Sequence, residues 1–208
     1  MTLTTWLAVV TICVLGAMSP GPSLALVLKQ TLAGGRRNGI ITALSHGLGV
    51  GIYAFLSILG LAAVITASPT AFSALQWGGA AYLAWLGVKG LRARQMATGA
   101  VLPDTPSGHS AARDGFFIAF LNPKIAVFFL ALFSQVVGTD TSLLAKLGYA
   151  ASALIIDTGW YLLVAWLFSN PRWLASLQRR AVWLERIFGV VLVALAGRLV
   201  AGIFATQA

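Results

Sequence analysis

The sequence predicts an all-α integral membrane protein in which six transmembrane helices form two inverted three-helix repeats. Three observations support this fold class. Of the 208 residues, 59% are hydrophobic and only 9% are charged, whereas a soluble domain carries about 25% charged residues. Long apolar stretches alternate with short basic connections, and motifs of proline and glycine recur in the same order in both halves. So few charges cannot cover a water-facing surface, and much of the surface must therefore face lipid.

Six apolar stretches are long enough for transmembrane helices, each of which needs about 20 residues. They span residues 3–28, 39–66, 70–91, 115–138, 147–169 and 182–206. Residues 38–88 contain no Asp, Glu, Lys or Arg. This stretch is too long for one helix, and Pro69 disfavours helical geometry at the residue before it. We therefore expect a tight hairpin between the second and third helices.

No Lys or Arg precedes the first apolar stretch. A signal peptide begins with a positive region, so we interpret this stretch as a retained transmembrane helix. Cys13 is the only cysteine of the chain, which excludes an internal disulfide and a cysteine-based metal cluster. We expect it to be a small apolar residue of the helix.

The basic residues indicate how the chain is oriented. The net charge is +9, but the charges lie between apolar stretches and form no face for binding nucleic acid. Three connections are basic: they hold Lys29, Arg36 and Arg37; Lys89, Arg92, Arg94 and Arg113; and Arg172, Arg179, Arg180 and Arg186. On the opposite side Lys146 is balanced by Asp140. The positive-inside rule places the three basic connections in the cytoplasm and both termini outside.

The chain divides into a first repeat at residues 1–96, a cytoplasmic linker at 97–114 and a second repeat at 115–208. Gly, Pro, Ser and Thr make the linker look flexible. Residues 171–186 mix tryptophans with arginines. This segment is either an interfacial helix along the membrane surface or a cytoplasmic loop with snorkelling side chains.

The two halves share three features in the same order. The first helix of each half is interrupted, by Ser19-Pro20-Gly21-Pro22 and by Leu121-Asn122-Pro123-Lys124. The second helix contains a Gly-x-Tyr motif, Gly51 to Tyr53 and Gly159 to Tyr161. The third helix contains two glycines eight residues apart, Gly79 with Gly87 and Gly189 with Gly197. Since each copy has three helices, the second must be inverted. Inverted repeats with broken helices are typical of transporters, which bind solutes near the membrane midplane.

The first interruption is expected near the middle of the membrane. Pro20 and Pro22 remove backbone donors and clash with the preceding turn. Backbone groups freed in this way must be buried in protein or face a water-filled cavity. The helix that restarts after Pro22 would present its positive dipole end to a carboxylate. The alternative is a structural kink, because proline is frequent in membrane helices.

The second interruption adds a cation. Lys124 either snorkels to the cytoplasmic surface or faces the cavity, as a partner for a substrate carboxylate or for Asp157. Asn122 is expected to satisfy a backbone group that Pro123 leaves free.

Two further polar residues lie inside apolar stretches. Asp157 has no basic neighbour at helical spacing, so its carboxylate must pair, take a proton or face water. This suits a proton carrier or an amine ligand, and the alternative is a structural hydrogen bond to another helix. His46 is either a titratable group or a neutral histidine at a helix contact. The nearby Gly47, Gly49 and Gly51 are expected to be close-packing positions.

The sequence lacks the motifs that are typical of several classes of enzyme and metal-binding protein. The chain has no hydrolase triad, phosphate-binding loop or metal-ligand cluster. Gly47, Gly49 and Gly51 do not form a nucleotide loop, which would follow a strand. We therefore expect no enzyme activity and no cofactor, and any transport must use an ion gradient or the gradient of the solute.

The motifs together resemble the lysine/homoserine exporter (LysE/RhtB) family over essentially the whole chain. They are Ser19 to Pro22, the glycine-rich region around His46, the segment from Ala81 to Gly87, and Gly115-Phe116 leading into Leu121 to Lys124. The resemblance implies a six-helix, proton-driven exporter of amino acids or their derivatives in a bacterial inner membrane. It also implies substrate-binding roles for Pro20, Gly21, Pro22, Asn122, Pro123, Lys124 and Asp157, with Ser19 as an accepted variant of the motif.

These observations predict alternating access by two rocking halves. A zwitterion would place its carboxylate at the helix ends freed by Pro20 to Pro22, with Lys124, and its ammonium at Asp157. A proton arriving from outside would then neutralise Asp157 and favour release, with His46 as a second candidate for proton coupling. The expected partners are the amino acid, protons and membrane lipid, and the glycines allow a homo-oligomer. The alternatives are an exporter of metals or other cations, a membrane enzyme that uses Asp157 and His46, and an assembly subunit.

Overall fold

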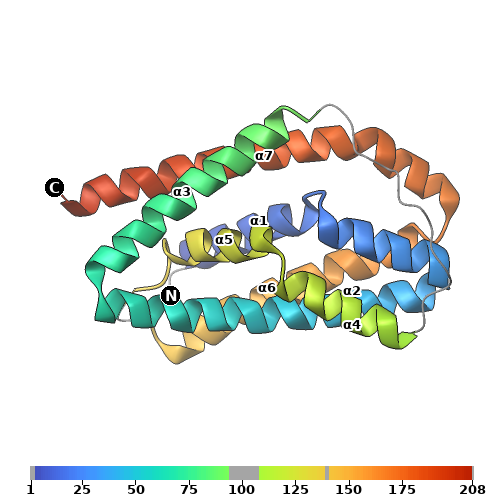
Figure 1. The fold of residues 1–208 in the computed structure, drawn as a ribbon, viewed down its shortest axis with the longest axis horizontal. Coiled ribbons are helices and arrows are strands. Elements are labelled where there is room, and N and C mark those ends of the chain that lie inside the picture. The colour runs from blue at the N-terminus through green and yellow to red at the C-terminus, as the bar shows by residue number, and fades with distance from the viewer. Residues whose placement is uncertain (1–2, 94–107, 139–140, 208) are drawn as a thin grey trace.

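A computed structural model describes residues 3–93, 108–138 and 141–207, and every regular element in these ranges is a helix (Figure 1). In chain order the helices are α1 (Leu3–Met18), α2 (Pro22–Ala67), α3 (Pro69–Leu91), α4 (Gly108–Phe120), α5 (Pro123–Phe133), α6 (Leu143–Leu167) and α7 (Pro171–Gln207). The expected all-α architecture is confirmed for this part of the chain.

Three helical segments are long and apolar enough to cross a membrane: α2, α6 and the part of α7 from Val182 to Phe204. The helices α4 and α5, which meet at a bend of 48°, make a fourth if they form one span. The outer surface is also apolar. Leu48, Ile155 and Trp166 are examples of large side chains that lie more than half exposed. An apolar surface of this extent indicates a nonpolar environment.

Prolines set the three interruptions predicted from the sequence. Helix α1 ends at Met18 and α2 restarts at Pro22, while α4 ends at Phe120 and α5 restarts at Pro123. Helix α3 begins at Pro69, directly after the capping residue Ser68, so the tight hairpin is confirmed. Proline suits the first helical position because its missing N–H would have no partner there.

The connection expected at residues 29–38 is present, but it is much shorter than predicted. The chain is helical on both sides of Gly35, which alone interrupts α2 with φ 74° and ψ 176°. Glycine adopts this left-handed conformation because it has no Cβ atom. Figure 1 shows α2 folding back on itself at this point, so Lys29, Arg36 and Arg37 lie on helical segments rather than on a loop.

Three other boundaries differ from the expected ones. Helix α4 begins at Gly108, inside the stretch assigned to the linker, and the rest of the linker up to residue 107 lies outside the described residues. Helix α5 ends at Phe133 rather than at residue 138. Helix α7 begins at Pro171, so the loop alternative for residues 171–186 is wrong. Whether this helical segment lies along a membrane surface stays a prediction, and most of its side chains lie outside the description.

The interrupted helices run through the middle of the molecule. Helix α2 packs against α4 and α6, α3 packs against α7, and α1 packs against α6. Figure 1 shows α3 and α7 along one edge, α2, α4 and α6 along the other, and α1 and α5 between them. Both termini and the α2–α3 hairpin lie at one end. The Gly35 turn and the first turns of α4 and α7 lie at the other, so several basic residues gather there.

Glycines allow the closest approaches between helices. A Cβ atom on Gly47 would meet the side chain of Thr158, one on Gly49 would lie 2.9 Å from the Cβ of Ala119, and one on Gly51 would lie 2.5 Å from a methyl carbon of Leu154. The expectation that these three glycines are close-packing positions is therefore confirmed. Such positions let helix backbones approach without a side chain between them.

The contact between α3 and α7 predicts opposite effects of the same substitution at two glycines of α7. A Cβ on Gly189 would lie 2.6 Å from the carbonyl oxygen of Gly87 and 2.8 Å from the nitrogen of Leu91, whereas one on Gly197 would meet nothing within 4 Å. Gly189→Ala should lower stability by roughly 1–3 kcal/mol because backbone atoms must move apart. Gly197→Ala should leave it unchanged or raise it, since alanine favours helix. Thermal unfolding in detergent checks both, and equal midpoints for the two variants would contradict the packing described here.

Candidate functional site

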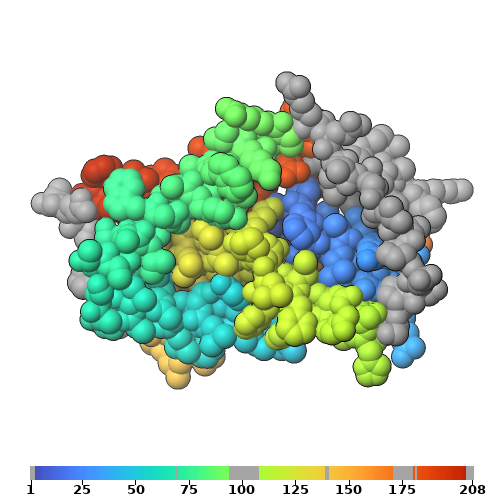
Figure 2. All heavy atoms as spheres, viewed as in Figure 1, coloured from blue at the N-terminus to red at the C-terminus, as the bar shows by residue number. Residues whose placement is uncertain are grey.

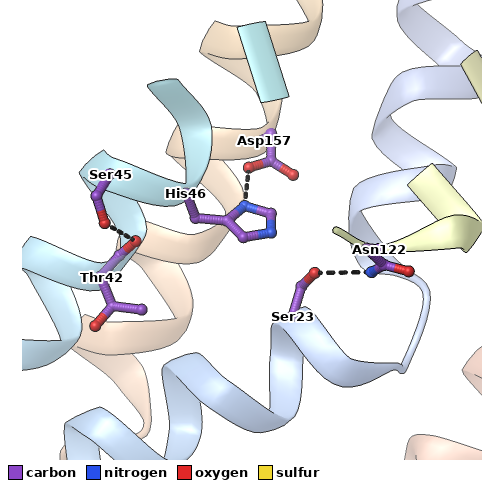
Figure 3. Close-up of polar contacts among 6 residues, drawn as sticks. All are labelled: Ser23, Thr42, Ser45, His46, Asn122 and Asp157. Atoms are coloured by element: carbon purple, nitrogen blue, oxygen red, sulfur yellow. Dashed lines mark hydrogen bonds and ion pairs between the residues drawn. The ribbon is translucent and has the colours of Figure 1, made fainter. Parts of the chain in front are cut away.

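The two helix interruptions face each other inside the molecule. The side-chain amide of Asn122, at the start of α5, donates to the hydroxyl of Ser23 at the start of α2 over 3.4 Å (Figure 3). The ammonium of Lys124 donates to the backbone oxygen of Pro20 over 3.1 Å and to the hydroxyl of Ser19. Residues about 100 positions apart in the sequence therefore build one polar centre.

The two restarted helices differ in how their first N–H groups are satisfied. The side-chain oxygen of Asn122 accepts the backbone N–H of Lys124 over 3.0 Å, as expected for the group next to Pro123. At α2 the capping position is Gly21, which has no side chain to accept a bond. The first N–H groups of a helix have no partner within it. The start of α2 is therefore the end that remains open to an anion.

A buried hydrogen bond links the side chains of His46 in α2 and Asp157 in α6. The Nδ1 atom of His46 lies 2.7 Å from a carboxylate oxygen of Asp157 (Figure 3). His46 is fully buried, and Asp157 is 8% exposed. The ring of Tyr161 stands edge-on to the imidazole, with 4.9 Å between ring centroids. The other ring nitrogen of His46, Nε2, is buried without a hydrogen-bond partner.

These groups line one cavity between the interruptions. Its wall is formed by Cys13, Gly16, Ala17, Ser19, Gly21, Pro22, Ser23, His46, Val50, Asn122, Lys124, Ile125, Phe128, Phe129, Ala153, Asp157, Tyr161 and Phe188. About 60 Å³ is accessible to the centre of a water molecule, several times the ~10–15 Å³ that one water needs. The cavity therefore has room for a small solute among polar and aromatic groups.

Most residues singled out from the sequence meet at this cavity. Seven line it: Ser19, Gly21, Pro22, His46, Asn122, Lys124 and Asp157. Of the other two, Pro20 contributes its carbonyl oxygen to Lys124, and Pro123 opens α5. Lys124 faces the cavity rather than snorkelling outward, and its ammonium lies 4.6 Å from the ring centre of Phe188. The carboxylate of Asp157 contacts His46 rather than Lys124.

Sequence reasoning missed part of the wall. It overlooked the hydroxyls of Ser23 and Tyr161 and the rings of Phe128, Phe129 and Phe188. Ser23 directly follows the Pro-Gly-Pro motif, and Tyr161 lies four residues after Asp157, one helical turn away. Those spacings were the available signal for the two hydroxyls. The sequence gives no signal for the phenylalanines, because apolar residues occur on every face of these helices.

A comparison with protein-family models decides the family. The model described as LysE type translocator matches residues 14–202. The chain belongs to this family. Members of the LysE type translocator family are membrane transporters rather than enzymes, so the expected absence of enzyme activity is confirmed.

Individual relatives cover nearly the whole chain. The threonine efflux protein of Escherichia coli (strain K12) is 28% identical over 191 residues, which cover 89% of this chain and 92% of that protein. The homoserine/homoserine lactone efflux protein of Salmonella typhimurium is 29% identical over 201 residues, which cover 92% and 97%. No solved structure matches the chain.

Proposed function

We propose that this LysE type translocator is a proton-coupled exporter of small amino acids or their derivatives in a bacterial inner membrane. The observation that carries the proposal is the distribution of charge in the cavity. Lys124 contacts the turn that precedes α2, and Figure 3 shows Ser23 at the start of α2 across a gap from the His46–Asp157 pair. A zwitterion that carries a carboxylate and an ammonium complements both.

The arrangement of the interrupted helices supports six spans in two inverted repeats. On this proposal α1 with the first part of α2 forms one broken span, and α4 with α5 forms its counterpart. Helix α2 then corresponds to α6, and α3 to α7, and the helices of each pair are also in contact. The basic residues gathered beside the Gly35 turn favour a cytoplasmic location for that end of the molecule. Both termini would then lie outside the cytoplasm.

The substrate carboxylate is proposed to bind at the start of α2. The unpartnered N–H groups there and the helix dipole favour negative charge. The ammonium of Lys124 lies beside the same turn, held by Ser19 and Pro20. A carboxylate could accept hydrogen bonds from the ammonium of Lys124 and from the hydroxyl of Ser19, while Lys124 keeps its bond to the carbonyl oxygen of Pro20.

The substrate ammonium is proposed to bind at Asp157. Only one of the two carboxylate oxygens of Asp157 contacts His46, and the carboxylate lines the cavity. The hydroxyls of Ser19, Ser23 and Tyr161, together with the cavity phenylalanines, leave limited space for the amino acid side chain. This fits small or hydroxylated amino acids, in line with the threonine and homoserine named for two relatives.

Transport would proceed by alternating access, with the two halves of residues 1–96 and 115–208 rocking around the cavity. Transporters of inverted-repeat design move one repeat against the other in this way. Each of the two interruptions belongs to a different half. A motion between the halves would therefore change the distances between Lys124 and Ser19 and between Asn122 and Ser23.

Efflux of labelled amino acids from preloaded cells tests the proposal. We expect selective efflux of threonine, homoserine or a similar small amino acid, and we expect a protonophore to reduce it. A vector without the gene provides the baseline, and membrane fractions confirm insertion. Absence of efflux for every amino acid in the panel, from protein shown to be in the membrane, would contradict the proposed substrate class.

A further inference from the structure

The unpartnered nitrogen of His46 has no role in the substrate scheme above. The imidazole is fully buried, lines the cavity, and its Nε2 atom makes no hydrogen bond. Figure 3 shows the free edge of the ring directed across the gap toward Ser23 and Asn122. A buried polar atom left without a partner destabilises the fold, so this nitrogen is expected to meet a group that enters the cavity.

The contact between Nδ1 and Asp157 determines whether Nε2 can accept a proton. An ionised carboxylate only accepts hydrogen bonds, so with Asp157 ionised the Nδ1 atom that faces it carries hydrogen. In a neutral imidazole the second nitrogen then holds a lone pair. Asp157 thus fixes the tautomer, and the edge-on ring of Tyr161 helps to fix the plane. The result is a proton-accepting nitrogen pointing into the cavity.

We propose that His46 accepts the coupling proton at Nε2, while Asp157 stays ionised, holds the imidazole and binds the substrate ammonium. This assignment rests on the exporter function proposed above. With a neutral imidazole the pair carries one negative charge and attracts an ammonium. With a protonated imidazole the pair is neutral overall, and its cationic ring repels the ammonium. One proton therefore competes with one substrate molecule, which is the requirement for exchange in opposite directions.

Four titratable side chains from other helices line the same cavity as His46. From α6 these are Asp157 and Tyr161, from α1 Cys13, and from α5 Lys124 on the same cavity wall. The ammonium of Lys124 is engaged by Ser19 and Pro20. Imidazole is the side chain that ordinarily changes charge between about pH 5 and 8. Substrate affinity should therefore fall with acidification across this range.

The matched test compares His46→Gln with His109→Gln in the full-length protein, reconstituted in liposomes. The substrate is whichever amino acid wild type transports best in the efflux panel. A glutamine amide retains a polar group near the Nε2 position but cannot take up a proton. His109, exposed in the first turn of α4, offers the same chemical change away from the cavity.

Wild type and His109→Gln should bind substrate roughly 10-fold more weakly at about pH 5.5 than at about pH 8, following the linkage of binding to one proton. His46→Gln should show an affinity that changes less than about 2-fold over this range. It should lose accumulation driven by a pH gradient, and exchange of labelled for unlabelled substrate should fall less than this accumulation. Persistent pH dependence and gradient-driven accumulation in His46→Gln would overturn the assignment.

NMR of the imidazole nitrogens observes the protonation of His46 directly, so this second test does not require the His46→Gln variant to fold. The chain has two histidines, so in His109→Gln the signals come from His46 alone. We expect the Nδ1–H tautomer at alkaline pH and a doubly protonated ring on acidification, with substrate shifting this step to lower pH. A ring that stays neutral down to about pH 5, where imidazoles are ordinarily charged, would overturn the assignment. Wild-type protein that transports no amino acid would instead defeat the exporter proposal.

Discussion

Asp157→Asn should lower amino acid efflux by roughly 30-fold or more, which corresponds to the 2–5 kcal/mol lost when one partner of a buried charge pair is removed. The asparagine amide has nearly the shape of the carboxylate but carries no charge for the substrate ammonium. It can also present an N–H to the Nδ1 atom of His46, so the tautomer of the imidazole is no longer fixed. Initial efflux rates, normalised to protein in the membrane, measure the effect.

Asp114→Asn is the matched control for this prediction. Asp114 lies in α4, where its carboxylate accepts from Gln30 over 3.5 Å and from Arg113, and it does not belong to the cavity wall. The same chemical change there should leave efflux within about 2-fold, as for a rim charge pair. Efflux near the wild-type rate in Asp157→Asn would show that the buried carboxylate serves only to join α2 and α6.

Substitutions of Asp157 and of His46 should impair transport in different ways. Loss of Asp157 removes a ligand, so both net efflux and exchange of labelled for unlabelled substrate should fall together. Loss of the titratable ring at His46 removes the group that links binding to protons and one contact of Asp157, so exchange should fall less than in Asp157→Asn. This contrast follows from the geometry, because one oxygen of Asp157 is engaged by His46 while the carboxylate also lines the cavity.

The interruptions of the fold were predictable from sequence because proline acts locally. A missing N–H and a fixed φ angle are properties of Pro22, Pro69 and Pro123 themselves, whatever packs around them. The connection around Gly35 was predicted in the right place, but its length was overestimated for the converse reason. A pair of glycines followed by two arginines indicates a loop, but a single residue with φ 74° reverses the chain and helix continues on both sides. Tertiary packing of α2 against α4 and α6 decides between these outcomes.

The composition of the site was more predictable than its connections. A polar residue inside an apolar stretch stands out because burying it in lipid is costly, so Asp157, His46 and Lys124 were identified one by one. Their partners were not, because His46 and Asp157 are 111 residues apart and no local pattern brings α2 to α6. The phenylalanines on the cavity wall could not be assigned to it from the sequence, because an apolar ring can face lipid, another helix or a substrate.

Lys124→Gln is the second large effect expected. We expect KM for export to rise by roughly 10-fold or more, since a hydrogen bond to a charged group contributes about 1.5–3 kcal/mol. The ammonium is the cation nearest to the open start of α2, where it contacts Ser19 and Pro20. Glutamine can replace these hydrogen bonds in part but supplies no charge for the substrate carboxylate. Transport of labelled substrate over a range of concentrations separates KM from the maximal rate.

Comparison of each amino acid with its amide separates a ligand role of Lys124 from a structural one. The amide lacks the carboxylate charge, so wild type should prefer the free acid and Lys124→Gln should lose most of that preference. If Lys124 only held the two interruptions together, both substrates would suffer equally. Lys124→Arg, which retains the charge, should keep the preference, and Lys146→Gln at the first turn of α6 should behave as wild type. An unchanged preference in Lys124→Gln would move the carboxylate site away from α2, because no other Lys or Arg lines this cavity among the described residues.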